Sequence, residues 1–358
     1  MKNLPLTVLL VLFASLLPAC HTHREVVGVA FHEEVNRSTR GAATALLGKL
    51  SEDQKKLALH DIKAPLKSDW HFIPRQRQGL TLGDMTNEQK TLVHHLMQTA
   101  LSDSGYLKAT DIIWLETVLY EMSNQDPTRD PGKYALQIFG DPTDEQAAWG
   151  WRLEGHHLSL NLTYAPTDLS HRPLKIAVTP VFFGTNPAVV QHGPLAGKRV
   201  LSNIHSLAVE LATAMNDEQR KKMMLDQKPR DVIAGPGREK ALSETVGLKH
   251  AEMTPKQSVL LYKILHTVCG NFDMHHRGVL WGAAIASRKQ VYDGVLDLSI
   301  AWAGPIDADK PFYFRIHGPA FVAEYSCQGI NHVHFVIHDL TDPLQEDLLK
   351  KHFEQHEH

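Results

Sequence analysis

Apolar positions recur with helical spacing in the first third of the chain and again after residue 255. In the segment 87–101 the apolar residues stand at 92, 93, 96, 97 and 100, on one face of a helix. Thr86 and Gln89 fit a capping box at its start, and Thr254 and Gln257 repeat that pattern before the helix expected at 256–268. Further helices are expected at 42–47, 52–59, 111–122 and 200–224.

Short apolar runs bounded by Gly and Pro follow each helical part, and such runs are typical of strands. The expected strands span 134–139, 148–154, 157–164 and 174–183, and then about 294–302, 312–317, 320–327 and 332–338, before a closing helix at 343–353. Helices and strands thus come in separate runs. The pattern predicts an α+β fold, with one or more antiparallel sheets and flanking helices.

Two parts of the chain resemble each other. Met85-Thr86-x-x-Gln89 matches Met253-Thr254-x-x-Gln257 at an offset of 168 residues, and Arg152-Leu153-Glu154-Gly155 matches Arg315-Ile316-His317-Gly318 at 163. Helical periodicity alone would not fix Met, Thr and Gln, although chance similarity between amphipathic helices is the alternative. We therefore expect an internal duplication of a helix-plus-strands unit, with half-repeats at about 85–165 and 253–338.

The N-terminus predicts export. Lys2 precedes an apolar stretch that is short for a membrane span, and Leu17-Pro18-Ala19-Cys20 resembles a bacterial lipobox. The resemblance implies a signal peptide at 1–19 and a lipidated Cys20 that anchors the protein to a membrane of the cell envelope, facing the periplasm. His21 favours the outer membrane; a plain secretory signal is the alternative. A tether at 20–38 and a single domain at 39–354 follow, with a linker excursion at about 227–251.

Composition narrows the class of partner. The formal net charge is −3 and no basic run is present, which argues against nucleic acid. The chain has 23 His among 358 residues, roughly three times ordinary usage. Besides Cys20, only Cys269 and Cys327 occur, either as a disulfide or as two buried thiols.

The sharpest histidine cluster lies in the strand expected at 332–338. Alternate side chains of a strand share a face, so His332, His334 and His338 point one way. Val333, Phe335 and Ile337 then face a core. Two imidazoles at i and i+2 can bind one metal ion. Imidazoles on a solvated sheet face are the alternative.

A second cluster surrounds Glu154-Gly155-His156-His157. Gly155 permits either a straight strand or a tight hairpin with both His at its tip, and in each case a β element presents an imidazole. Arg152 and Asn161 flank the cluster. A hydrogen-bonded hairpin in which Arg152 pairs with Glu154 is the structural alternative.

The corresponding positions of the second half carry different chemistry. Glu324 stands where the first half has Asn161, and His317 where it has Glu154. A half-buried Glu324 suits a general base or metal ligand, although an ion pair with Arg315 would be purely structural. Arg152 and Arg315, at equivalent places, suit the binding of an anionic group.

An ordered set of motifs resembles the exported bacterial and fungal family catalogued as domain of unknown function 3500. The set includes Trp70-x-Phe72-x-Pro74, Phe139-Gly140-x-Pro142, Glu154-Gly155-His156-His157, Arg315-Ile316-His317-Gly318-Pro319 and Asn331-His332-x-His334. The resemblance covers roughly residues 42–353. It implies one domain over the whole chain and supplies no activity.

We therefore expect an exported, lipid-anchored, metal-dependent enzyme, a hydrolase before an oxidoreductase, that acts on a small or anionic substrate. The expected cofactor is a divalent metal ion, Zn²⁺ before Cu or Fe. Zinc would activate water for hydrolysis, which is the favoured reaction, whereas copper or iron would favour oxidation. A non-catalytic metal- or solute-binding lipoprotein is the alternative, and an envelope interaction protein is a third. The expected metal ligands are His156, His157, His332 and His334; the expected catalytic residues are Glu154, Glu324 and His317; the expected substrate-binding residues are Arg152, Arg315 and Asn161.

Overall fold

The computed structural model describes residues 38–166, 175–242, 244–285, 296–329, 331–346 and 348–350. The signal peptide expected at 1–19 and all of the expected tether except residue 38 lie outside the described residues. So does the end of the closing helix beyond residue 350.

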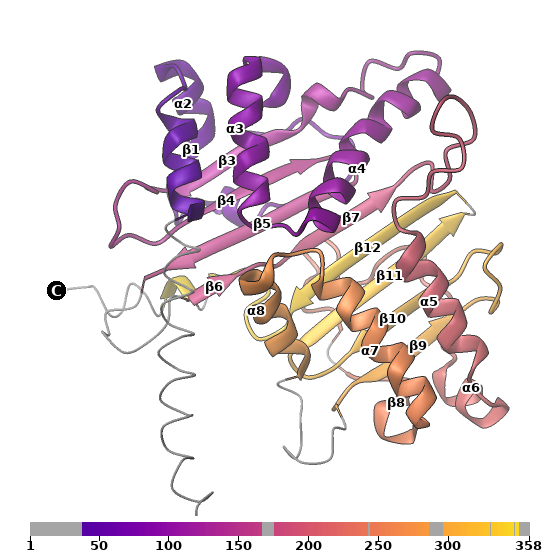
Figure 1. Ribbon diagram of the computed structural model, residues 1–358. Coiled ribbons are helices and arrows are strands. Elements are labelled where there is room, and N and C mark those ends of the chain that lie inside the picture. Colours follow the sequence, from indigo (N-terminus) through magenta and orange to yellow (C-terminus); the bar gives the residue numbers. More distant parts are fainter. Residues whose placement is uncertain are drawn as a thin grey trace, which may run out of the picture.

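One large sheet runs through the described part of the chain (Figure 1). Its strands follow the order β1-β3-β4-β5-β7-β12-β11-β10-β9-β8, with β2 beside β3 and β6 beside β5. Among these pairings only that of β1 with β3 is parallel. The bounds are β1 Leu59–His60, β2 Leu80–Thr81, β3 Ala135–Gly140, β4 Trp149–Gly155, β5 Leu158–Ala165, β6 Lys175–Ala177, β7 Val181–Thr185, β8 Leu248–Lys249, β9 Ser299–Ala303, β10 Tyr313–His317, β11 Phe321–Gly329 and β12 His332–Asp339.

Helices cover one face of this sheet, as Figure 1 shows. They are α2 Glu52–Ala58, α3 Asn87–Gln98, α4 Asp103–Met122, α5 Ser202–Thr213, α6 Asp217–Met223, α7 Pro255–Cys269 and α8 Met274–Ile285. Short 3₁₀ turns occur elsewhere along the chain, at Pro65–Lys67, Leu82–Asp84, Pro131–Lys133 and His250–Glu252. Residues 38–47 are also helical. The predicted α+β class with a mostly antiparallel sheet is therefore confirmed.

The main core lies between the sheet and these helices. Alternate strand residues such as Trp151, Phe183 and Phe335 meet apolar helix residues such as Leu96 and Ile264, and all five are buried in one cluster. Burial of this apolar surface is the main stabilising contribution to the fold. The intervening strand residues face the opposite side of the sheet.

The helix bounds differ from the sequence prediction in three places. Helix α4 begins at Asp103 rather than 111, because the Ser102 side chain caps it and Gly105 fits within its first turn. A Cβ at Gly105 would lie 1.8 Å from the Asn271 carbonyl oxygen, so the glycine permits a close approach of two chain segments. The helix expected at 200–224 is two helices, α5 and α6, and Asn216 caps the second. Helix α8 was not predicted.

The two halves of the sheet have the same strand order when each is followed from its outer edge to the middle of the sheet. The order β2-β3-β4-β5-β7 in one half corresponds to β8-β9-β10-β11-β12 in the other, with β2 and β8 each antiparallel to the next strand, and β7 pairs with β12 at the seam between the halves. Gln54 and Gln89 exchange amide hydrogen bonds of 3.0 and 2.8 Å, and Gln219 and Gln257 exchange bonds of the same lengths. These repeated contacts support the expected duplication, which itself stays a prediction.

Two further expectations concern the cysteines and the membrane. Cys269 and Cys327 are both free and buried, in agreement with the thiol alternative. Among the helices of the described residues, none has the length and apolar character needed to span a membrane.

Candidate metal centre

The face of the sheet opposite the helices is polar, and two irregular segments pack against it. Residues 61–79 cover β4 and β5 of the first half, and residues 226–242 cover β11 and β12 of the second, as their hydrogen bonds to Arg152, Glu154, Glu324 and His338 establish. Val232 is 1 % exposed and Ala234 is fully buried. The segment expected to be a linker excursion, about 227–251, therefore contributes residues to the core.

Arg152 binds backbone carbonyls of the first covering segment. Its guanidinium donates to the carbonyl oxygens of Leu66, Lys67 and Asp69, and also to the Asn161 side chain. Arg152 is 1 % exposed, and Asn161 in turn donates to the Pro180 carbonyl. Arg152 and Asn161, two of the three predicted substrate-binding residues, thus have structural contacts. Arg152 holds the covering segment 61–79, and Asn161 holds the connection that leads into β7.

Glu154 is hydrogen-bonded within the same network. One carboxylate oxygen accepts from Arg77 Nε at 2.9 Å and the other from the His71 backbone amide at 2.7 Å. Arg152 Nε lies farther away, 3.9 Å from the carboxylate. The main partner of Glu154 is therefore Arg77 rather than Arg152.

Glu324 occupies an equivalent environment in the second half. Its two oxygens accept hydrogen bonds from the backbone amides of Ile233 and Ala234, each at 2.7 Å, and Tyr313 donates its hydroxyl proton at 2.5 Å. Arg315 lies directly opposite Glu324 on the paired strand. These contacts tie the second covering segment to the sheet.

His317 and Arg315 are buried, at 3 % and 4 % exposure. Within the described part of the chain, His317 Nδ1 and Arg315 Nε have no hydrogen-bond partner. Burial and the nearby Arg315 lower the pKa of His317 to about 4, so its imidazole is neutral at pH 7. The structure does not bring His317 into contact with the histidine cluster described next.

His156 and His157 form the two-residue turn between β4 and β5, because Gly155 pairs directly with Leu158. His157 adopts a φ of 63°, which is left-handed backbone that few non-glycine residues occupy. Its amide donates to the Phe72 carbonyl, and its carbonyl accepts from the Gly184 amide at 2.7 Å. A Cβ at Gly184 would lie 2.8 Å from the His157 ring, so this glycine provides the space for the imidazole.

The turn brings His157 to the histidines of β12. His157 Nε2 lies 2.9 Å from His332 Nε2 and 3.2 Å from His334 Nε2. His157 and His334 are 3 % and 5 % exposed, and His332 is half-buried. The structure thus brings together three of the four predicted metal ligands, with one ring nitrogen of each within 4.8 Å of the others.

These distances suit a shared metal ion. Imidazole nitrogens bind Zn²⁺ at about 2.0–2.1 Å, which at a tetrahedral angle puts two ligand atoms about 3.3 Å apart. The distances of 2.9 and 3.2 Å require only a small outward movement of the rings. The same residues therefore fit a tetrahedral ion with three protein ligands.

Protons alone do not satisfy the three rings. Asp231 Oδ1 lies 2.7 Å from His334 Nδ1, so the carboxylate accepts the Nδ1 proton, and Nε2 is the ring nitrogen that remains to offer a lone pair to a metal ion. His157 Nε2 holds at most one proton, which forms one linear hydrogen bond. One of its two contacts, with His332 or with His334, is then left without a good hydrogen bond, whereas a central cation would bind three lone pairs.

Burial keeps His157 and His332 neutral. It lowers the pKa of His157 well below the usual range, with the neighbouring imidazoles adding to the effect, and it lowers the pKa of His332 to about 4. Neutral imidazole is the form that binds metal. The electrostatics of the cluster therefore agree with its geometry.

Asp231 was missed by the sequence analysis. It lies in the second covering segment, 103 residues from His334 along the chain. Burial opposes its ionisation, yet the hydrogen bond from His334 leaves its pKa lowered overall. A carboxylate on the far nitrogen of a metal-binding imidazole fixes the tautomer and raises the basicity of the ligand.

His156 faces a different partner, Glu116 on α4. His156 Nδ1 is hydrogen-bonded to a Glu116 oxygen, and its ring stacks on His157 with centroids 3.7 Å apart. Arg129 Nη1 lies 3.2 Å from the same nitrogen. Glu116 is 2 % exposed. The only signal for it in the sequence is an acidic residue inside the mainly apolar stretch 112–119 of α4.

His338 shares the strand face of His332 and His334 but not their site. Its Nε2 donates to the Ala234 carbonyl at 2.7 Å, and burial lowers its pKa to about 4. Its ring also meets Trp70 edge-on at 5.9 Å. His338 therefore holds the second covering segment.

Comparison with known proteins yields a family. A family model described as protein of unknown function (DUF3500) matches residues 32–342. No curated protein and no solved structure matches the chain. The match confirms the resemblance that the sequence motifs indicated, and it supplies no activity.

Proposed function

Since this chain belongs to the DUF3500 family, whose function is unknown, we propose from its own residues that it is a metal-dependent enzyme with a divalent ion bound by His157, His332 and His334. One observation carries the proposal: three imidazole ring nitrogens from two separate β elements converge at metal-ligand spacing, and Asp231 orients one of them. Three protein ligands leave one position of a tetrahedral ion for water, which is the arrangement of catalytic rather than structural zinc sites.

The favoured reaction is hydrolysis. A bound Zn²⁺ would lower the pKa of its water toward neutrality. His156, stacked on His157 and fixed at Nδ1 by Glu116, offers its other ring nitrogen to accept a proton beside the site. In this proposal Glu116 and His156 take the acid–base role that the sequence analysis assigned to Glu154, Glu324 and His317. Glu154 and Glu324 position the covering segments.

Elemental analysis tests this proposal directly. The chain purified without a His tag should carry about one divalent ion per molecule. His332→Ala and His334→Ala should each remove it while leaving the fold intact, because each removes one of three ligands. His95→Ala, on an exposed part of α3, is the matched control and should retain the ion, as should His352→Ala in the C-terminal tail.

The outcome also distinguishes the alternatives. Zinc would support hydrolysis, whereas copper or iron would favour the oxidoreductase. A metal-free protein in which His334→Ala behaves as the wild type contradicts the metal site altogether. A stoichiometric metal with no activity toward any substrate would support the metal-binding lipoprotein.

We further propose that the protein acts in the cell envelope, anchored by lipid on Cys20. The support is the lipobox-like Leu17-Pro18-Ala19-Cys20 after an apolar stretch. A substrate of this enzyme would then be a small or anionic molecule that reaches the periplasm.

A further inference from the structure

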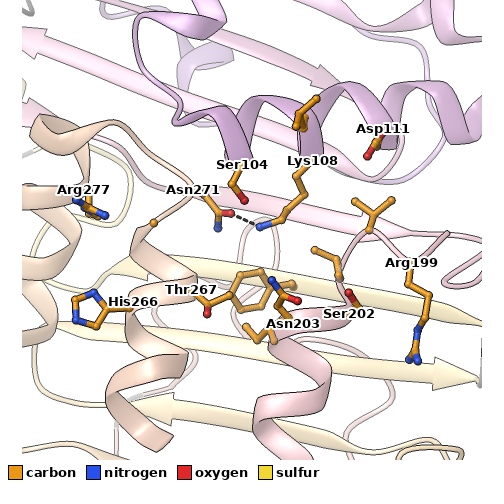
Figure 2. Close-up of a pocket in the computed structure, with 16 residues that line it drawn as sticks. Ser104, Lys108, Asp111, Arg199, Ser202, Asn203, His266, Thr267, Asn271 and Arg277 are labelled. Carbon is orange, nitrogen blue, oxygen red and sulfur yellow. Dashed lines mark hydrogen bonds between the residues drawn. The ribbon is translucent and has the colours of Figure 1, made fainter. Parts of the chain in front are cut away.

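A concave site lies on the helix-covered face of the sheet. It has a volume of about 690 Å³ and is bordered by the first half of α4, the start of α5 and the end of α7 (Figure 2). Phe335 lines it, on the face of β12 opposite His334. None of the three clustered histidines contributes to it, so this site is separate from the proposed metal centre.

The two halves of the molecule meet at this pocket. Ser102 Oγ donates to the Gly270 carbonyl, and the Ser102 amide donates to the Asn271 carbonyl at 3.1 Å. The α4 wall therefore comes from the first half and the α7 wall from the second. Ligand pockets often form at such junctions between structural units.

Lys108 provides the charge at the centre of the pocket. Figure 2 shows its side chain reaching from α4 toward Asn271, and its ammonium donates to the Asn271 side-chain oxygen. Asn271 is 2 % exposed and neutral, so it does not offset the charge. Burial lowers the pKa of Lys108 to about 8, which leaves the amine mostly protonated at pH 7.

Two further basic residues and several polar ones share the lining with apolar side chains such as Phe335. Arg199 and Arg277 lie on opposite sides of Lys108, with Ser202 and Thr267 between them (Figure 2). The lining contains one acid, Asp111, and Lys198 already pairs with it at 2.5 Å. The charge that remains in the pocket is therefore positive.

The start of α5 adds to this potential. Ser202 is its first residue, and the preceding Leu201 provides no side-chain cap. The first amides of an α-helix lack intrahelical partners, and the helix dipole is positive at this end. An uncapped helix start in a basic pocket favours an anionic group.

We propose that this pocket binds a small organic anion with at least two acidic groups, such as a tricarboxylate or a phosphorylated metabolite. Lys108 and the start of α5 bind one acidic group, and the flanking arginines, one on each side of Lys108, bind the remaining ones. The volume is in the range of small-molecule sites. This inference does not rest on the proposed metal centre.

Calorimetric titration of the full chain with citrate tests the proposal, with inorganic phosphate and acetate as comparison probes. Citrate should bind more tightly than acetate by at least tenfold, because acetate offers a single charge. Lys108→Met and Arg199→Gln should each weaken citrate binding by at least tenfold. Lys263→Met, which removes a positive charge from an exposed position of the same α7 helix, should leave it unchanged.

Thermal unfolding separates a binding role of Lys108 from a structural one. A half-buried ammonium without a counter-charge destabilises the free protein, so Lys108→Met should raise the unfolding temperature without citrate and abolish the rise that citrate causes. Equal affinity for citrate in the wild type and Lys108→Met would overturn the proposal. So would binding of acetate as tight as that of citrate.

Discussion

Glu324 accepts three hydrogen bonds in a place that water does not reach. Two come from backbone amides of the second covering segment and one from Tyr313. A carboxylate that is engaged on both oxygens is poorly placed to take up a proton from substrate. We infer that its contribution is to hold residues 226–242, and with them Asp231, against the sheet.

Glu324→Gln tests this structural role. The amide nitrogen of Gln cannot accept a hydrogen bond, so one buried donor loses its partner and the free energy of unfolding should fall by about 2 kcal/mol. Urea-induced unfolding measures this change, and metal content should stay at the wild-type level. Glu121→Gln, at an exposed position of α4, is the control and should unfold as the wild type. Loss of metal at unchanged stability would instead support a direct role of Glu324 in the site.

Residue patterns predicted part of this site. Strand periodicity was enough to put His332 and His334 on one face, and Gly155 was enough to suggest a turn at His156 and His157. The pairing of that turn with β12 depends on which strands are neighbours at the seam, and local periodicity carries no such information. Glu116 and Asp231 were missed for the same reason, since each is far along the chain from its histidine partner.

At the scale of elements, the second covering segment supplies both structure and chemistry. Pro229, Gly235-Pro236-Gly237 and several charges gave it the composition of a loop, and it does lack regular structure. It nevertheless buries Val232 and holds Asp231 on His334. The composition of residues 226–242 correctly predicted that they form neither helix nor strand. It could not predict that they pack against the sheet, because that packing depends on strand residues far away in the sequence.

Asp231→Asn should weaken metal binding by about tenfold without removing the site. The neutral amide still accepts the Nδ1 proton of His334, but it raises the basicity of the imidazole less than a carboxylate does. Competition with a chelator of known affinity measures the dissociation constant. Asp226→Asn, at an exposed position of the same segment, should bind metal as the wild type. An unchanged affinity in Asp231→Asn would mean that the carboxylate only anchors the loop.

At the scale of the whole molecule, the α+β class followed from the separate runs of helices and strands. The continuous sheet did not, since two half-sheets joined edge to edge have the same local patterns as two separate sheets. The start of α4 at Asp103 was not predicted, because a glycine such as Gly105 normally disfavours a helix. Gly105 is explained only by the close approach of Asn271, which is distant in the sequence. Long-range contacts decided each of these features.

Cys20→Ser tests the proposed membrane anchor. If lipid on Cys20 is the attachment, its removal should shift the protein from the membrane fraction to the soluble fraction, since acyl chains rather than a spanning helix would hold it. Fractionation of cells that express each form, followed by immunoblotting, measures the distribution. Cys327→Ser, which alters a buried thiol, is the control and should stay with the membrane. Membrane association that persists in Cys20→Ser would contradict the lipobox.

The seam between β7 and β12 has a consequence for when the ion can enter. His157 and His334 are 177 residues apart along the chain, and they approach each other only after both half-sheets have formed and joined. Joining segments so distant is a slow step of folding. If the chain crosses the inner membrane unfolded, as its proposed signal peptide implies, the ligands assemble only after translocation. The metal would then be chosen by the ion content of the compartment in which the protein folds, and not by the cytoplasm in which it is made.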